Sequence, residues 1–212
     1  MPWNEIYRNR SSTKSIIWES EKMEKIYLII GLGNPGREYE NTRHNMGFHF
    51  LDCFARTHNV TTWQEKFGGL ISSFSQQDHK VFLFKPLTYM NNSGEAIIQV
   101  IDYYKIPLQQ VLILHDDMDL PLGSYRLRKN GSSAGHNGLK SIEHFLKTQN
   151  YQRLKFGISK NAFMDVKDYV LGKFNADEQA VISSLEPTII SLLDDFLKID
   201  FDLLMNRYNH KK

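Results

Sequence analysis

Polar residues that can perform chemistry gather in five short blocks of the sequence. The blocks combine histidines, carboxylates, hydroxyls and side-chain amides with glycines. A neutral histidine can take a proton, a carboxylate can orient it, and an asparagine amide can donate a hydrogen bond to a carbonyl oxygen. This inventory is typical of hydrolysis by an activated water molecule. The blocks are residues 31–36 (GLGNPG), 41–48 (NTRHNMGF), 85–94 (KPLTYMNNSG), 115–121 (HDDMDLP) and 131–139 (GSSAGHNGL).

Other reaction classes have less support. The one cysteine, Cys53, falls within an expected helix, so it can form no internal disulfide and is a poor candidate for a nucleophile. The H-E-x-x-H motif of zinc peptidases and the G-x-S-x-G motif of serine hydrolases do not occur. A metal site at 115–117 has little support from spacing alone.

The block GLGNPG matches the G-x-G-x-x-G spacing of dinucleotide-binding proteins, which alone is a weak signal. That motif needs a helix that begins at once and an acid at the end of the next strand. Here Pro35 and Gly36 delay the helix, and Asp52 falls within it. The pattern therefore favours a tight corner that presents Asn34 at the end of a strand, with nucleotide binding as a weaker alternative.

The elements that must position these blocks alternate along the chain. Apolar runs predict strands, and apolar residues at helical spacing predict amphipathic helices. The expected strands are 26–31, 68–75, 80–85, 111–115, 123–128 and 153–159; the expected helices are 45–57, one from Ser93 to before Pro107, 138–147, and 177–205 with a break near Pro187. This order predicts an α/β fold: a single domain with a twisted mixed β-sheet flanked by helices on both faces, in which 68–75 and 80–85 form an antiparallel hairpin.

Composition fits one globular domain. The chain has 212 residues, of which 41% are hydrophobic and 12% aromatic, enough for a substantial core. Residues 1–24 are a polar extension without a motif, and residues 25–212 form the expected domain. No run of 18 apolar residues or signal-peptide centre occurs, so we expect a cytoplasmic protein without membrane contact.

Charge is distributed unevenly. The net charge is only +2, but residues 122–160 contain eight basic residues and one acid, Glu143. Such a block suits a face that binds a polyanion, because phosphate binding with counterion release needs clustered cations. A solvated surface is an equally good interpretation of charge alone.

Taken in order, these motifs resemble the bacterial-type peptidyl-tRNA hydrolases. The resemblance covers about residues 26–205 and rests on GLGNPG with Tyr39, on TRHNMGF, on KPLTYMNNSG, on HDDMDLPLGSYRLRKNGSSAGHNGLKSI and on RLKFGI. Agreement over several separate blocks is far more specific than any single motif.

The resemblance implies a role for each site residue and no metal or organic cofactor. It makes His44 the general base and Asp116 the carboxylate that orients it. The chemistry of ester hydrolysis adds a catalytic role for Asn91, whose NH₂ group can donate to the oxyanion. The resemblance also implies a monomer that acts on peptidyl-tRNA without an obligate protein partner. Substrate-binding roles fall to Asn34, Tyr39, Met90, Asn91 and Asn137, and contacts with tRNA phosphates to Arg128 and Lys155, with Lys129 and Arg153 as neighbours.

One segment departs from the family pattern, and one alternative function stays open. Residues 159–165 (SKNAFMD) depart from the Gly/Pro turn common in that family, so the loop that borders the RNA side is expected to differ in shape. A non-catalytic RNA-binding protein on the same fold is the main alternative. Retention of His44, Asp116, Asn91 and Asn137 together favours catalysis, because RNA binding needs only the cations.

Overall fold

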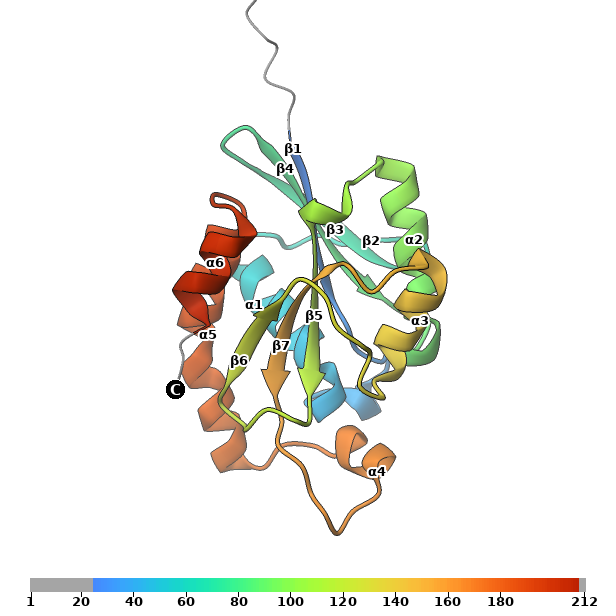
Figure 1. Cartoon of the computed structure of the whole chain (residues 1–212), viewed down its shortest axis with the longest axis vertical. Helices are drawn as coiled ribbons and strands as arrows, with labels where there is room; N and C mark the ends of the chain where they lie inside the picture. Colours follow the sequence, from blue (N-terminus) through green and yellow to red (C-terminus); the bar gives the residue numbers. More distant parts are fainter. Residues whose placement is uncertain (1–24, 210–212) are drawn as a thin grey trace, which may run out of the picture.

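The computed structural model describes residues 25–209, and its centre is a seven-stranded mixed sheet (Figure 1). The strands are β1 (Lys25–Gly31), β2 (Gln64–Lys66), β3 (Gly69–Gln76), β4 (His79–Pro86), β5 (Val111–Asp117), β6 (Tyr125–Arg128) and β7 (Gln152–Gly157). Their order across the sheet is β2-β3-β4-β1-β5-β7-β6. The four central strands, β4, β1, β5 and β7, are parallel, and the antiparallel pairs lie toward the two edges. The expected hairpin is the β3–β4 pair.

Helices cover both faces of this sheet, as the sequence predicts. They are α1 (Met46–Thr57), α2 (Ser93–Tyr104), α3 (Asn137–Leu146), α4 (Val166–Leu171), α5 (Ala176–Phe196) and α6 (Phe201–Tyr208). Side chains alternate along β1, so Ile29 joins the core beneath α1, α5 and α6, while Leu28 and Ile30 join the core beneath α2 and α3. Figure 1 shows α5 and α6 on one side of the sheet and α2 and α3 on the other.

Three local predictions need correction. The short elements β2 and α4 were not expected, because three exposed residues and a six-residue helix carry little periodic signal. The break near Pro187 is wrong, since α5 runs through Pro187 without interruption. Burial of Ile189, Leu192 and Phe196 against the sheet stabilises the helix on the far side of the proline. The chain turns instead before Asp200, whose side chain caps α6.

Two glycines bring α1 unusually close to the ends of the central strands. A Cβ at Gly47 would lie 2.3 Å from the carbonyl oxygen of Leu114 in β5, and a Cβ at Gly31 would lie 2.4 Å from the carbonyl oxygen of Gly47. Larger residues at either position would push the helix away from the sheet. The turn that immediately precedes α1 is therefore held against the carboxyl end of β5.

The expected extension at residues 1–24 lies outside the described residues. Within residues 25–209, no helix combines the length and apolar character needed to cross a bilayer.

Candidate active site

The carboxyl ends of the parallel strands border a cavity of about 880 Å³. Parallel strands all point their carboxyl ends to one edge, where the loops that follow them meet. β5 and β7 run toward the same end of the molecule, where α4 also lies (Figure 1). Eight of the residues expected at the site line this cavity: Asn34, Tyr39, His44, Met90, Asn91, Asp116, Asn137 and Lys155.

The imidazole of His44 and the carboxylate of Asp116 are in direct contact. His44 belongs to the single 3₁₀ turn Arg43–Asn45 before α1, and Asp116 lies near the end of β5. His44 Nδ1 lies 2.9 Å from Asp116 Oδ1, and the two residues are only 7% and 3% exposed. Donation from Nδ1 fixes the neutral tautomer of the ring, so Nε2 keeps a lone pair that can accept a proton.

A second histidine shares the same carboxylate oxygen. His136 Nε2 lies 3.0 Å from Asp116 Oδ1, and the rings of His44 and His136 are 4.7 Å apart. His136 Nδ1 accepts hydrogen bonds from the backbone N–H groups of Gly138 and Leu139, which caps α3. A nitrogen that accepts two hydrogen bonds carries no proton, so the proton of His136 must be on Nε2 and must point at Asp116.

Burial and hydrogen bonding separate the pKa values of these three groups. Burial lowers the pKa of His44, but the charge and hydrogen bond of Asp116 outweigh it, so the net shift is upward from 6.5. Burial lowers the pKa of His136 more than Asp116 raises it, which keeps that ring neutral. Burial alone would raise the pKa of Asp116, yet the imidazoles of His44 and His136 hold it well below its usual range. Asp116 is therefore a permanent anion and His44 the group that titrates.

Asn34 is fixed by hydrogen bonds on three of its polar groups. Its backbone N–H donates to Asn45 Oδ1 at 2.8 Å, and its backbone carbonyl accepts from Asn45 Nδ2 at 3.0 Å. Its side-chain Oδ1 accepts from the backbone N–H of Met90 at 2.8 Å. The side-chain NH₂ of Asn34 is therefore the part that can donate to a ligand in the cavity. Asn45 was not expected at the site, although it follows His44 directly.

The remaining amides lie on exposed turns at the rim. Asn91 is in the 3₁₀ turn Met90–Asn92 after β4, and Asn137 is the first residue of α3; both are exposed. Tyr39 meets Tyr89 edge to face, with ring centroids 6.4 Å apart. Tyr89 has a positive φ of 58°, which is uncommon for a bulky side chain, and is half exposed beside the cavity.

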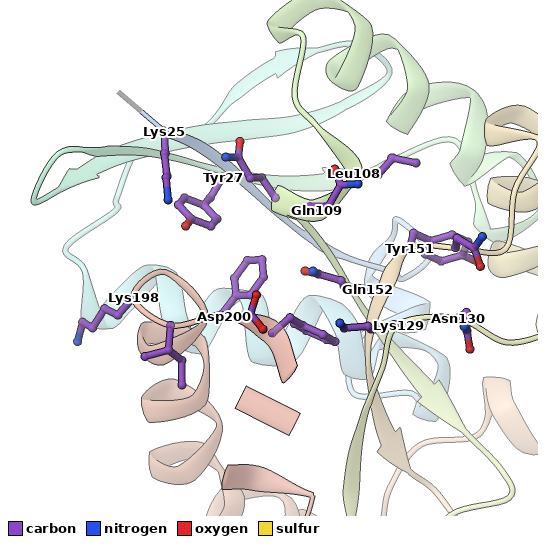
Figure 2. A pocket seen from close by; sticks show the side chains of 15 residues that line it. Lys25, Tyr27, Leu108, Gln109, Lys129, Asn130, Tyr151, Gln152, Lys198 and Asp200 are labelled. Atoms are coloured by element: carbon purple, nitrogen blue, oxygen red, sulfur yellow. The ribbon is translucent and has the colours of Figure 1, made fainter. Parts of the chain in front are cut away.

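The cations expected to bind RNA occupy four different environments. Lys155 lines the cavity and pairs with Asp117, whereas Arg128 is exposed at the end of β6. Lys129 pairs with Asp202 of α6 and lines a different cavity of about 680 Å³ (Figure 2). In register, Arg128 lies opposite Arg153 at the start of β7, away from the strand ends that carry Asp116.

Arg153 requires a correction, because its guanidinium is buried and cannot reach a phosphate. The residue is 1% exposed, and its Nη1 donates to the carbonyl of Ser132 at 3.0 Å. Its Nη2 donates to the carbonyls of Gly131 and Gln149, and its Cζ lies 4.1 Å from the ring centroid of Tyr151. Arg153 thus holds the loop that leads to His136 and α3.

We expect Arg153→Ala to lower the free energy of unfolding by about 3 kcal/mol, because it leaves buried partners of a charged group unpaired. Urea unfolding followed by circular dichroism measures this. Arg126→Ala is the matched control, since Arg126 lies on the neighbouring strand but is exposed. Equal stability of the two variants would contradict the structural role of Arg153.

The site geometry bears on the alternatives left by the sequence. GLGNPG leads into the 3₁₀ turn Arg37–Tyr39 instead of a helix N-terminus, and Asp52 lies inside α1, where it accepts from Lys85 Nζ at 2.6 Å. Neither group is placed for a dinucleotide.

His44, Asp116 and His136 bring three potential metal-ligand atoms within 4.8 Å of one another. His136 Nδ1 accepts two backbone hydrogen bonds, so its Nε2 carries the proton and has no lone pair to offer a metal.

Comparison with known proteins identifies the family. The family model described as peptidyl-tRNA hydrolase matches residues 28–212. The chain belongs to this family. It is 44% identical over 182 residues to the peptidyl-tRNA hydrolase of Listeria welshimeri and 46% identical over 185 residues to that of Bacillus cytotoxicus; each alignment covers 86% of this chain and 99% of the relative. A crystal structure of peptidyl-tRNA hydrolase from Acinetobacter baumannii matches with a TM-score of 0.82 and 34% identity, over 90% of this chain and 97% of that one.

Within this peptidyl-tRNA hydrolase fold, residues 159–165 lead into α4 at the edge of the cavity. Ser159 has a positive φ of 61°, and Phe163 is fully exposed. Asp165 caps α4, and Val166 and Val170 of α4 line the cavity.

Proposed function

We propose that this protein hydrolyses the ester bond that joins a peptide, or an N-blocked amino acid, to the 3′ end of tRNA, with His44 as the general base. The observation that carries the proposal is the 2.9 Å contact between His44 Nδ1 and the buried anion Asp116 at the edge of the large cavity. Membership of the peptidyl-tRNA hydrolase family supports the choice of substrate.

In the proposed reaction, Asp116 holds the proton of His44 on Nδ1, and Nε2 removes a proton from water. The hydroxide attacks the ester carbonyl, and the side-chain NH₂ of Asn91 donates to the oxyanion that develops. As the tetrahedral intermediate collapses, the C–O bond to the ribose breaks and the ribose oxygen takes the proton from His44. The products are a free carboxylate and a tRNA with a free hydroxyl, and no cofactor is required.

The peptide is proposed to lie along the rim of the cavity. Asn34 has its NH₂ group available, and Asn137 is exposed at the start of α3, so both can bind backbone amides without selecting a side chain. Tyr39 and the buried Met90 supply apolar surface on the same side. These contacts suit a substrate class with variable sequence.

The tRNA is proposed to be held by phosphate contacts from Arg128 and Lys155. Contacts of this kind position a nucleic acid and carry no base information, so tRNAs of different sequence are treated alike. We infer that a monomer performs the reaction, because every proposed group comes from one chain. We also place the reaction in the cytoplasm.

The direct test compares N-acetyl-aminoacyl-tRNA with the unblocked aminoacyl-tRNA. We expect the blocked ester to be cleaved much faster, because the unblocked amine presents a charge where a peptide amide would bind Asn34 or Asn137. Release of labelled amino acid measures both rates. Binding of either tRNA without cleavage would instead support the non-catalytic RNA-binding alternative.

The salt dependence of KM tests the RNA contacts. If Arg128 and Lys155 each neutralise one phosphate, Arg128→Ala and Lys155→Ala should each raise KM and reduce the slope of log affinity against log salt by about 0.9. Lys198→Ala, an exposed lysine beside the other cavity, is the control (Figure 2). An unchanged slope in both variants would show that these cations are only solvated surface.

A further inference from the structure

A second group of potential metal ligands bridges α1 and α5, separate from the cavity that holds His44. His49 and Cys53 are four residues apart on α1 and therefore share one face of the helix. Glu186 of α5 faces them. His49 Nε2 lies 3.1 Å from Glu186 Oε1 and 3.7 Å from Cys53 Sγ, and the three ligand atoms all lie within 4.8 Å of one another.

The two separations from His49 Nε2 are close to those around a small tetrahedral ion. Zinc binds imidazole nitrogen and carboxylate oxygen at about 2.0–2.1 Å and thiolate sulfur at about 2.3 Å, so neighbouring ligands in a tetrahedron are about 3.3 Å (N and O) and about 3.5 Å (N and S) apart. The observed contacts differ from those values by a few tenths of an ångström. Small rotations of the side chains would therefore admit the ion.

We propose that His49, Cys53 and Glu186 bind one Zn²⁺ ion, with a fourth position left for water. On binding, the Cys53 thiol releases its proton to solvent, because a coordinating thiol is deprotonated. The thiolate and the carboxylate then balance the charge of the ion. This proposal concerns a metal where the sequence predicts none, and it does not depend on the proposed hydrolytic function.

The site is both accessible and supported. The side chains of His49 and Glu186 are 34% and 29% exposed, and His49 lines a cavity of about 340 Å³, whereas Cys53 is buried behind them. Arg56 Nη2 lies 3.1 Å from Cys53 Sγ, so it can continue to donate to the sulfur once the thiolate is metal-bound.

A neighbouring pair shows what an ordinary contact between the same helices looks like. His58 at the end of α1 bonds Asp194 of α5 through Nε2 at 3.0 Å. Of these two histidine–carboxylate pairs, the one at His49 has a sulfur ligand beside it. The pair at His58 is therefore a matched control for a metal effect.

Cobalt provides the decisive experiment, because it occupies zinc sites and forms a sulfur-to-metal charge-transfer band in the near ultraviolet. Cys53 is the only cysteine in the whole chain, so such a band can arise from no other residue. We expect one equivalent of Co²⁺ to produce the band. Added Zn²⁺ should displace the Co²⁺ and abolish the band. We also expect Zn²⁺ to raise the thermal unfolding midpoint, because the ion links α1 to α5 and binds only the folded chain.

Variants of the three ligands test the proposed site directly. Cys53→Ser should remove the band, and His49→Gln and Glu186→Gln should each weaken Co²⁺ binding at least tenfold, whereas His58→Gln should leave it unchanged. Circular dichroism confirms that each variant is folded. Absence of the band in the wild-type protein, or Co²⁺ binding by His49→Gln and Glu186→Gln as tight as that of the wild type, would overturn the proposal. So would a zinc effect on unfolding that survives Cys53→Ser but is lost in His44→Ala, since the ion would then lie at the other cluster.

Discussion

Replacing His44 with alanine is expected to lower kcat for peptidyl-tRNA cleavage by about 10²–10⁴-fold, the usual contribution of a positioned general base. The variant keeps Asp116, the asparagines of the cavity and every cation. Affinity for tRNA should therefore change little, and the loss should fall on kcat and not on KM. Single-turnover release of labelled peptide, together with tRNA binding measured by fluorescence, separates the two quantities.

The control for this variant is His58→Ala, which removes another histidine that contacts a carboxylate, but on the far end of α1. It should retain full activity. Added imidazole should partly restore His44→Ala, because the cavity remains and Asp116 can still orient the small base. Full activity without imidazole would contradict the assignment of His44.

The convergence of the site was predictable because every block of polar residues follows a strand or precedes a helix. The carboxyl ends of β1, β4 and β5 meet at one edge, so Asn34, Asn91 and Asp116 reach one cavity although they are far apart in sequence. Strands such as β5 could be recognised for a different reason: a parallel strand buried along its whole length reads as a continuous apolar run.

Residues whose role depends on a loop conformation could not be predicted. His136 contacts Asp116 only because its Nδ1 caps α3 and turns the ring toward the cavity. The sequence shows a histidine in a small-residue loop, but no spacing rule relates it to position 116. Arg153 shows the opposite error, because a basic residue within a basic block is predicted to be exposed to solvent. Its burial follows from its packing on Tyr151 and from its hydrogen bonds to the carbonyls of residues 131 and 132, which the sequence does not show.

The proposed zinc ligands could not be predicted from the sequence either. His49 and Cys53 have the spacing of a helical ligand pair, but the third ligand, Glu186, comes from a helix more than 130 residues later. Two ligands at i and i+4 occur by chance on many helices, so the sequence pattern alone predicts nothing. Packing of α1 against α5 makes the arrangement specific.

The second large effect is expected for Asp116→Asn, which removes charge but little volume. In the wild-type protein the pKa of His44 is raised above 6.5, because the Asp116 charge and hydrogen bond outweigh burial. The base must be neutral to act, so kcat/KM should fall tenfold per unit as the pH drops below that raised pKa. Without the anion, burial is left as the main influence, and the pKa of His44 moves below 6.5.

We therefore expect Asp116→Asn to shift the acid limb of the pH profile to lower pH and to lower kcat at neutral pH by about 10²–10⁴-fold, since the tautomer of His44 is no longer fixed and the imidazolium is no longer stabilised. The matched control is Asp117→Asn, which removes the neighbouring carboxylate and its pairing with Lys155 but leaves His44 and His136 their partner. Its acid limb should coincide with that of the wild type. An acid limb that stays in place in Asp116→Asn, or moves to higher pH, would show that the 2.9 Å contact does not set the basicity of His44.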